Sequence, residues 1–210
     1  MMAPAAPRWT RKRLEAMLGT CYGRTPTGHV DTAAVANTAG VSVRTVQRWM
    51  AGSNRQNAAI PHTRLLQLCR PPADTQERSQ QAADYASEAI TKISLPKGRG
   101  ILPAWREQGW LEPHVVGVLA LRGLPLRQVV ISNGTARSTA DLRRRGELLD
   151  VTTVPTRFHA TVLVHEVLSR VEPWCVLPSR EILAVGRTQV WAEDGPVVDL
   201  SQLAVAAALR

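Results

Sequence analysis

The sequence is poor in cysteine and in long apolar runs. Its three cysteines, Cys21, Cys69 and Cys175, lie far apart and form no C-x-x-C pair, which argues against a disulfide scaffold or a cysteine zinc site and favours a reducing, cytoplasmic compartment. No apolar run approaches the ~18 residues that a membrane-spanning helix needs, so we expect no membrane partner. The first residues are Ala/Pro-rich and then basic, without the apolar core of a secretion signal. Hydrophobic residues still make up 44% of the 210 residues, enough for a buried core.

Acidic residues are nearly missing from the first third of the chain. Residues 1–70 contain ten Lys and Arg but only Glu15 and Asp31 as acids, a net charge of +8, whereas the whole chain carries +9. Such a local positive field attracts polyanions and raises their rate of encounter. Arg outnumbers Lys along the entire chain, including its nearly neutral part, so we attach no functional meaning to that bias.

Apolar spacing and capping residues predict several helices. We expect helices over residues 10–18, 32–38 and 43–50, and a fourth short one near 60–68 that ends before two prolines. Residues 74–93 form the clearest isolated helix, opened by the capping pair Asp74 and Glu77. Residues 96–100 are the best linker candidate. Further on, the compact apolar run 115–121 is interpreted as helix, 129–131 and 148–154 as strands, and the Ala-rich tail 201–209 as helix.

Residues 32–51 contain the most specific pattern of the chain. Asp31 and Ser42 are placed to cap two successive helices, and Gly40 lies between them, where a positive φ is required. Ala36 is small where the two helices cross, and apolar side chains face inward from both helices: Val35, Val41, Val46 and Trp49. This segment resembles the helix-turn-helix family of DNA-binding proteins, of the type found at the N-terminus of phage repressors and bacterial regulators.

The resemblance implies an interface with double-stranded DNA. In such proteins the second helix lies in the major groove and its N-terminal residues contact base edges. The residues that this places at base edges are Ser42, Val43, Arg44 and Gln47; the chemistry of Arg suits guanine, that of Gln suits adenine, and Val can touch a thymine methyl group. Phosphate contacts, which provide affinity and register, are expected from Arg11, Lys12, Arg13, Arg48, Arg55 and Gln56.

The order of the expected helices and strands predicts the architecture. We expect an α+β protein with an all-α helix-turn-helix domain over residues 1–72, an amphipathic connecting helix and linker over 73–100, and a mixed α+β domain over 101–210. The last domain would serve dimerisation, a second DNA contact or regulation. The run Arg143, Arg144 and Arg145 is either such a second phosphate contact or a solvated helix end.

Enzyme motifs do not appear. His165-Glu166 begins like a zinc-protease motif, but Ser169 stands where the second histidine would be. Some repressors with a similar N-terminal domain cleave themselves with a Ser-Lys dyad, yet no lysine follows Lys97 in this chain. We therefore expect no enzyme, no cofactor and no metal.

These observations predict a sequence-specific transcriptional regulator. A repressor of the phage or mobile-element type, acting by occupying its operator, is the leading interpretation, in the cytoplasm of a bacterial cell or phage-infected host and associated with the nucleoid. A homodimer is one option for its assembly. The alternative is a DNA-binding protein outside transcription: a small packaging subunit, a replication or partition initiator, or a terminal protein.

Overall fold

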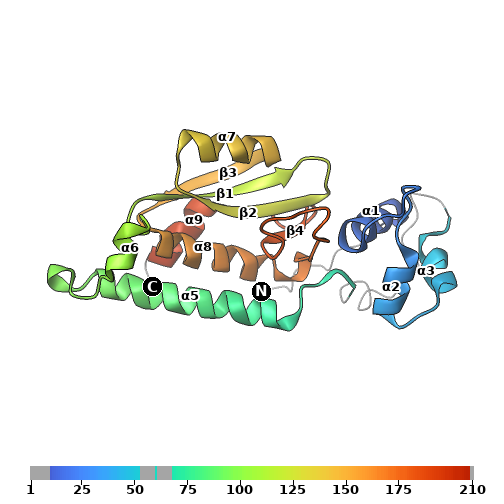
Figure 1. Ribbon diagram of the computed structural model, residues 1–210, viewed down its shortest axis with the longest axis horizontal. Helices are drawn as coiled ribbons and strands as arrows, with labels where there is room; N and C mark the ends of the chain where they lie inside the picture. Colours follow the sequence, from blue (N-terminus) through green and yellow to red (C-terminus); the bar gives the residue numbers. More distant parts are fainter. Residues whose placement is uncertain (1–9, 53–59, 61–67, 209–210) are drawn as a thin grey trace. The chain divides into compact units, whose positions relative to one another are not determined.

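The computed structural model describes residues 10–52, 60 and 68–208. The chain forms two compact units. Unit 1 comprises Met1–Pro71 and Pro173–Gly195, and unit 2 comprises Pro72–Glu172 and Pro196–Arg210. Helices and an antiparallel sheet make the protein α+β, which confirms the predicted class (Figure 1). No helix in the described part of the chain combines the length and apolar character needed to cross a membrane.

Three helices at the N-terminal end of unit 1 follow the predicted order. They are α1 (Arg11–Tyr22), α2 (Thr32–Ala39) and α3 (Val43–Met50). Each starts at a polar side chain that accepts a hydrogen bond from a backbone N–H of the first turn: Thr10, Asp31 and Ser42. Such caps satisfy N–H groups that have no partner within the helix, so local sequence is sufficient to place these starts.

The segment 173–195 returns to unit 1, which differs from the predicted division at residue 101. Two backbone hydrogen bonds of 2.9 Å attach it to the N-terminal residues: Ser179 N–H donates to the carbonyl of Thr20, and Leu177 N–H to that of Cys69. Its short strand β4 (Val190–Ala192) is fully apolar and buried. This division differs from the predicted contiguous domain 101–210, because these residues have partners about 100 residues or more away in the chain.

Unit 2 contains three antiparallel strands, β1 (His114–Leu121), β2 (Leu126–Ser132) and β3 (Gly146–Val154), with β1 in the centre. Gly117 of β1 is paired with Val130 on one side and Val151 on the other. The predicted helix over 115–121 is thus wrong. As the central strand, β1 is covered on both faces, so it reads as one continuous apolar run instead of alternating apolar and polar residues.

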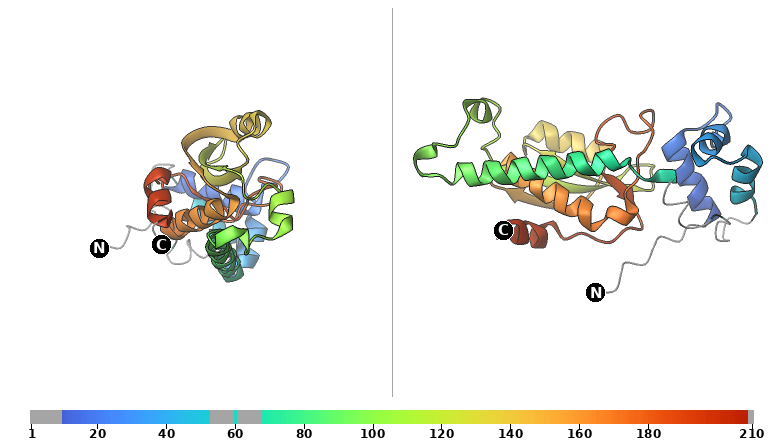
Figure 2. Two further views of the ribbon diagram at one scale, coloured as in Figure 1. Left: turned by 90° about the vertical axis from the view of Figure 1, so that its left-hand side faces the viewer. Right: turned by 90° about the horizontal axis from the view of Figure 1, so that it is seen from below.

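Helices cover both faces of these strands (Figure 1). Helix α7 (Ala136–Arg145) lies on one face, while α8 (Arg157–Arg170) and α9 (Leu200–Ala208) lie on the other. Figure 2 shows α5 (Ala73–Ile93) running alongside α8. The predicted connecting helix is therefore a structural part of unit 2.

An aromatic cluster fixes α5 to the start of α8. Buried Trp105 of α6 (Pro103–Glu107) packs against Phe158, with ring centroids 4.7 Å apart. Ala86 and Ala89 of α5 complete this cluster, because their small side chains let the helix approach the two rings. In the sequence, the 3-10 helix η1 (Pro96–Gly98) follows α5, and η2 (Glu172–Trp174) follows α8.

Candidate nucleic-acid interface

A tight turn joins α2 to α3. Gly40 adopts a left-handed conformation, with φ 61° and ψ 37°, and its N–H donates to carbonyls at the end of α2. Val41 N–H then donates to the carbonyl of Ala36 over 3.1 Å, so the last carbonyls of the helix are satisfied as the chain reverses. A side chain at position 40 would meet no atom within 4 Å. The glycine is therefore needed for its backbone conformation, as predicted, and not for space.

The capping residue Ser42 starts α3 directly after this turn. Its Oγ accepts a hydrogen bond from Thr45 N–H at 3.2 Å and lies 3.0 Å from the hydroxyl of Thr45. The hydroxyl group of Ser42 is thus engaged within the helix, although the residue is exposed. Its first role in this structure is to begin α3.

Buried side chains hold α3 in place from one side. Val46 is fully buried and Trp49 is 4% exposed. They face a core made of α1 and α2 side chains: Leu14, Met17, Leu18, Val35 and Ala36. This agrees with the inward positions predicted from the sequence, and it leaves the opposite side of α3 uncovered.

The uncovered side of α3 carries the predicted base contacts. Val43, Arg44, Gln47 and Arg48 are all exposed. They follow one another at helical spacing on one face, which we call the α3 outer face. Together they present two guanidinium groups, one amide and one apolar side chain. Within the described part of the chain, neither arginine of this face forms an ion pair.

The expected phosphate contacts have three different environments. Lys12 is exposed, whereas Arg11 is half-buried. Arg13 is also half-buried and its Nη2 atom lies 2.9 Å from Asp194 and 3.6 Å from Glu193. Arg55 and Gln56 lie outside the described residues. Among the three basic residues at the start of α1, only Lys12 is exposed, and it forms no ion pair with a described residue.

The restraint on Arg13 comes from the segment 173–195, which the sequence did not indicate. The two acidic residues lie in a turn that follows β4. No local pattern connects residue 13 with residue 194, because the contact depends on the chain returning to unit 1. From the sequence alone, Arg13 and Lys12 are equivalent candidates for a phosphate contact.

A second link within unit 1 ties the end of α1 to residues 68–69. The hydroxyl of Tyr22 donates to the carbonyl of Leu68, and burial raises the pKa of Tyr22 above its ordinary value. Cys69 is buried, and both the hydrogen bond with Cys21 and burial raise its pKa. These groups remain protonated at neutral pH, so they contribute packing and not nucleophilic chemistry.

The described residues contain no cluster of metal ligands. Within residues 10–52, 60 and 68–208, no three His, Cys, Asp or Glu side chains come together as a metal would require. No protein-family model, no curated protein and no solved structure matches this chain.

Proposed function

We propose that this protein is a sequence-specific regulator of transcription that binds double-stranded DNA through α3. The observation that carries the proposal is the division of this helix into two sides. Val46 and Trp49 anchor it in the core, while Arg44, Gln47 and Arg48 are exposed together on the outer face. A helix held in this way can enter a groove without losing its packing, and the major groove of B-DNA is wide enough to admit it.

The outer face offers chemistry for base recognition. A guanidinium group can donate two hydrogen bonds to O6 and N7 of guanine, and a glutamine amide can pair with N6 and N7 of adenine. Arg44 and Gln47 lie near the start and middle of α3 and are assigned these roles. Val43, which is 40% exposed, is suited to contact with a thymine methyl group.

The remaining cations provide affinity without discrimination. Arg48 stands in the last turn of α3 and, with Lys12, is assigned to phosphate oxygens. Such contacts release counterions and make binding strongly dependent on salt. The net charge of +8 on the first 70 residues favours the approach of the whole unit to a duplex.

The regulatory mechanism that we propose is occupancy. A protein bound at an operator excludes the polymerase, which is the action of a repressor of the phage or mobile-element type. Two copies related by two-fold symmetry would recognise a palindrome with half-sites about one helical turn apart. The process would take place in the cytoplasm, on nucleoid or phage DNA.

Selection from a random duplex library tests this function. The full-length protein is incubated with the library at low salt, bound duplexes are recovered, and one enriched site is footprinted. We expect one enriched motif, protection of that motif, and loss of enrichment for Arg44→Ala. Arg170→Ala removes the same charge from an exposed position of α8 in unit 2 and should leave the motif unchanged.

Two outcomes would contradict the proposal. Failure to retain any duplex at low salt would exclude DNA binding, and retention of all sequences equally would exclude an operator. Mapping the recovered sites in genomic DNA then separates a regulator from the non-transcriptional alternative. Sites at promoters support repression, whereas sites confined to replication origins or DNA ends would support an initiator or a terminal protein.

A further inference from the structure

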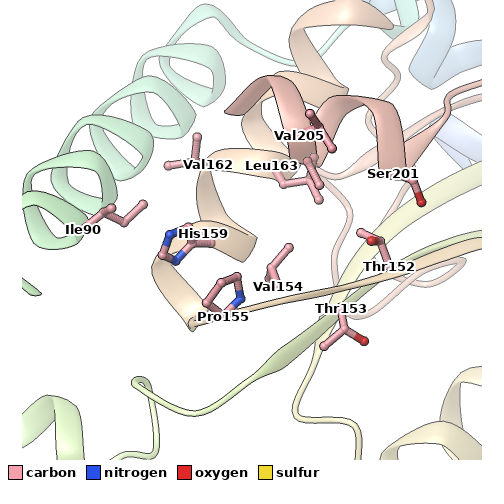
Figure 3. Close-up of a pocket in the computed structure, with 11 residues that line it drawn as sticks. Ile90, Thr152, Thr153, Val154, Pro155, His159, Val162, Leu163, Ser201 and Val205 are labelled. Carbon is pink, nitrogen blue, oxygen red and sulfur yellow. The ribbon is translucent and has the colours of Figure 1, made fainter. Parts of the chain in front are cut away.

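Unit 2 contains a cavity of about 360 Å³ that lies apart from the α3 outer face. It is formed by residues 152–155 at the end of β3, the first half of α8, and α9. Ile90 of α5 lies at one side. Figure 3 shows His159 and Val162 on one side of this space, and Ser201 and Thr152 on the other. Pockets that bind small molecules begin at about this volume.

The lining determines what kind of molecule the cavity suits. Most of the lining side chains are aliphatic, and the polar ones are His159 and three hydroxyl groups, among them Ser201. No Asp, Glu, Lys or Arg side chain lines the cavity. The site is partly open, with Thr153, Pro155 and Ser201 exposed. An ionised ligand would still lose part of its hydration there without gaining a partner of opposite charge, which is costly. The cavity therefore selects for uncharged, mainly apolar molecules.

His159 provides a directed hydrogen bond in this apolar lining. The Oγ1 atom of Thr156 caps α8 by accepting from His159 N–H at 3.4 Å, and it lies 2.8 Å from Nδ1 of the same residue. The hydroxyl of Thr156 can donate its proton to Nδ1, and we assign it this role. The neutral ring then carries its proton on Nε2. Burial lowers the pKa of His159, which keeps the ring neutral at pH 7.

The Nε2 atom is available to a ligand. Among the residues that the structure describes, none accepts a hydrogen bond from this atom. His159 nevertheless lines the cavity and is half-buried. A polar hydrogen at an apolar cavity wall is most stable when a ligand oxygen or nitrogen accepts it.

We propose that this cavity is a binding site for a neutral, largely apolar small molecule of about two rings that carries one hydrogen-bond acceptor for His159 Nε2–H. The size follows from comparison with cavities of about 150 Å³, which hold one benzene molecule. The proposal does not depend on DNA binding, because every residue that carries it lies in unit 2.

Benzophenone is a suitable probe of this site. It has two rings, no charge and one carbonyl acceptor, and near-ultraviolet light attaches it covalently to neighbouring C–H bonds. Diphenylmethane has the same two rings without the acceptor, and para-benzoylbenzoate adds a negative charge. Calorimetry on the full-length protein should show saturable binding of one benzophenone per chain. Binding of para-benzoylbenzoate should be at least about tenfold weaker.

Variants test the location and the hydrogen bond. Val205→Trp, at a position that is 63% exposed on the cavity rim, should reduce benzophenone affinity at least about tenfold. Val197→Trp, at a position 85% exposed and outside the lining, is the matched control and should leave it unchanged. In His159→Phe, the preference for benzophenone over diphenylmethane should fall roughly three- to tenfold, as for the loss of one hydrogen bond.

Photochemical attachment maps the site without any variant. Peptides that contain residues 152–163 or 201–205 should carry the label. Absence of saturable binding, labelling elsewhere, or unchanged affinity in a folded Val205→Trp protein would each overturn the proposal. So would sedimentation showing that Val205→Trp converts a dimer to a monomer, since a second copy of the chain would then occupy the cavity.

Discussion

Arg13 and Asp194 form an ion pair that joins the first helix of unit 1 to its last turn. The Nη2 atom of Arg13 lies 2.9 Å from Oδ1 of Asp194, and both side chains are about one quarter exposed. Arg13 was expected to bind phosphate, yet its charge is already balanced within the protein. Asp194 also lowers the local positive potential at this point of an otherwise basic unit.

We expect Arg13→Ala to reduce stability rather than to act on DNA affinity alone. Losing a half-buried pair should destabilise unit 1 by about 1–2 kcal/mol, between the values of exposed and buried ion pairs. Hydrogen exchange of α1 amides measures this change. Lys12→Ala removes the neighbouring exposed charge and should weaken DNA binding with little change in exchange. Equal affinity loss for both variants at unchanged stability would show that Arg13 contacts phosphate after all.

The two arginines of the α3 outer face should behave differently. Arg44→Ala should weaken binding to the preferred duplex by about 1–3 kcal/mol and leave binding to random duplexes nearly unchanged, because a base contact is lost. Arg48→Ala should weaken both to a similar extent and reduce the dependence on salt, because a phosphate contact is lost. Competition binding against the two kinds of duplex measures both effects. A uniform loss for Arg44→Ala would remove it from the base-contacting set.

Gly40 allows a test of the turn without disturbing its packing. Its φ of 61° is unfavourable for residues with a Cβ atom, while the space around it is open. Gly40→Ala should therefore cost about 1–2 kcal/mol of backbone strain. Gly40→Asn should cost less, since Asn tolerates this conformation better. Urea unfolding of unit 1 compares the two, and equal losses would mean that crowding, not conformation, requires the glycine.

Local signals in the sequence are sufficient to predict the first three helices. The caps Asp31 and Ser42 and the turn residue Gly40 act on backbone groups within a few residues, so their effect can be recognised from spacing alone. The exposure of Arg44 and Gln47 follows from the same helical period once Val46 and Trp49 are placed in the core. DNA binding itself stays a prediction.

Contacts between distant residues could not be predicted in the same way. The sequence of β1 predicts a helix, because an apolar run that is buried on both faces has no period that distinguishes a strand from a helix. The return of residues 173–195 to unit 1 depends on partners such as Thr20 and Cys69, to which no sequence pattern points. The cavity beside His159 likewise arises where β3, α8 and α9 meet, and its lining residues are separated in the chain.

The half-buried ring of His159 should make the stability of unit 2 depend on pH. Burial lowers the pKa of this histidine in the folded protein, so the unfolded chain binds a proton more readily, near its ordinary pKa of about 6.5. The stabilisation of unit 2 by neutral His159 is therefore complete above that pH. It is lost as the pH falls from there through the pKa that His159 has in the folded protein. The free energy of unfolding, measured by urea from pH 8 down to pH 5, should decline in this range. His159→Gln should reduce the decline, while His29→Gln, at an exposed position of unit 1, should not. A decline of the same size in His159→Gln would assign the effect to another group.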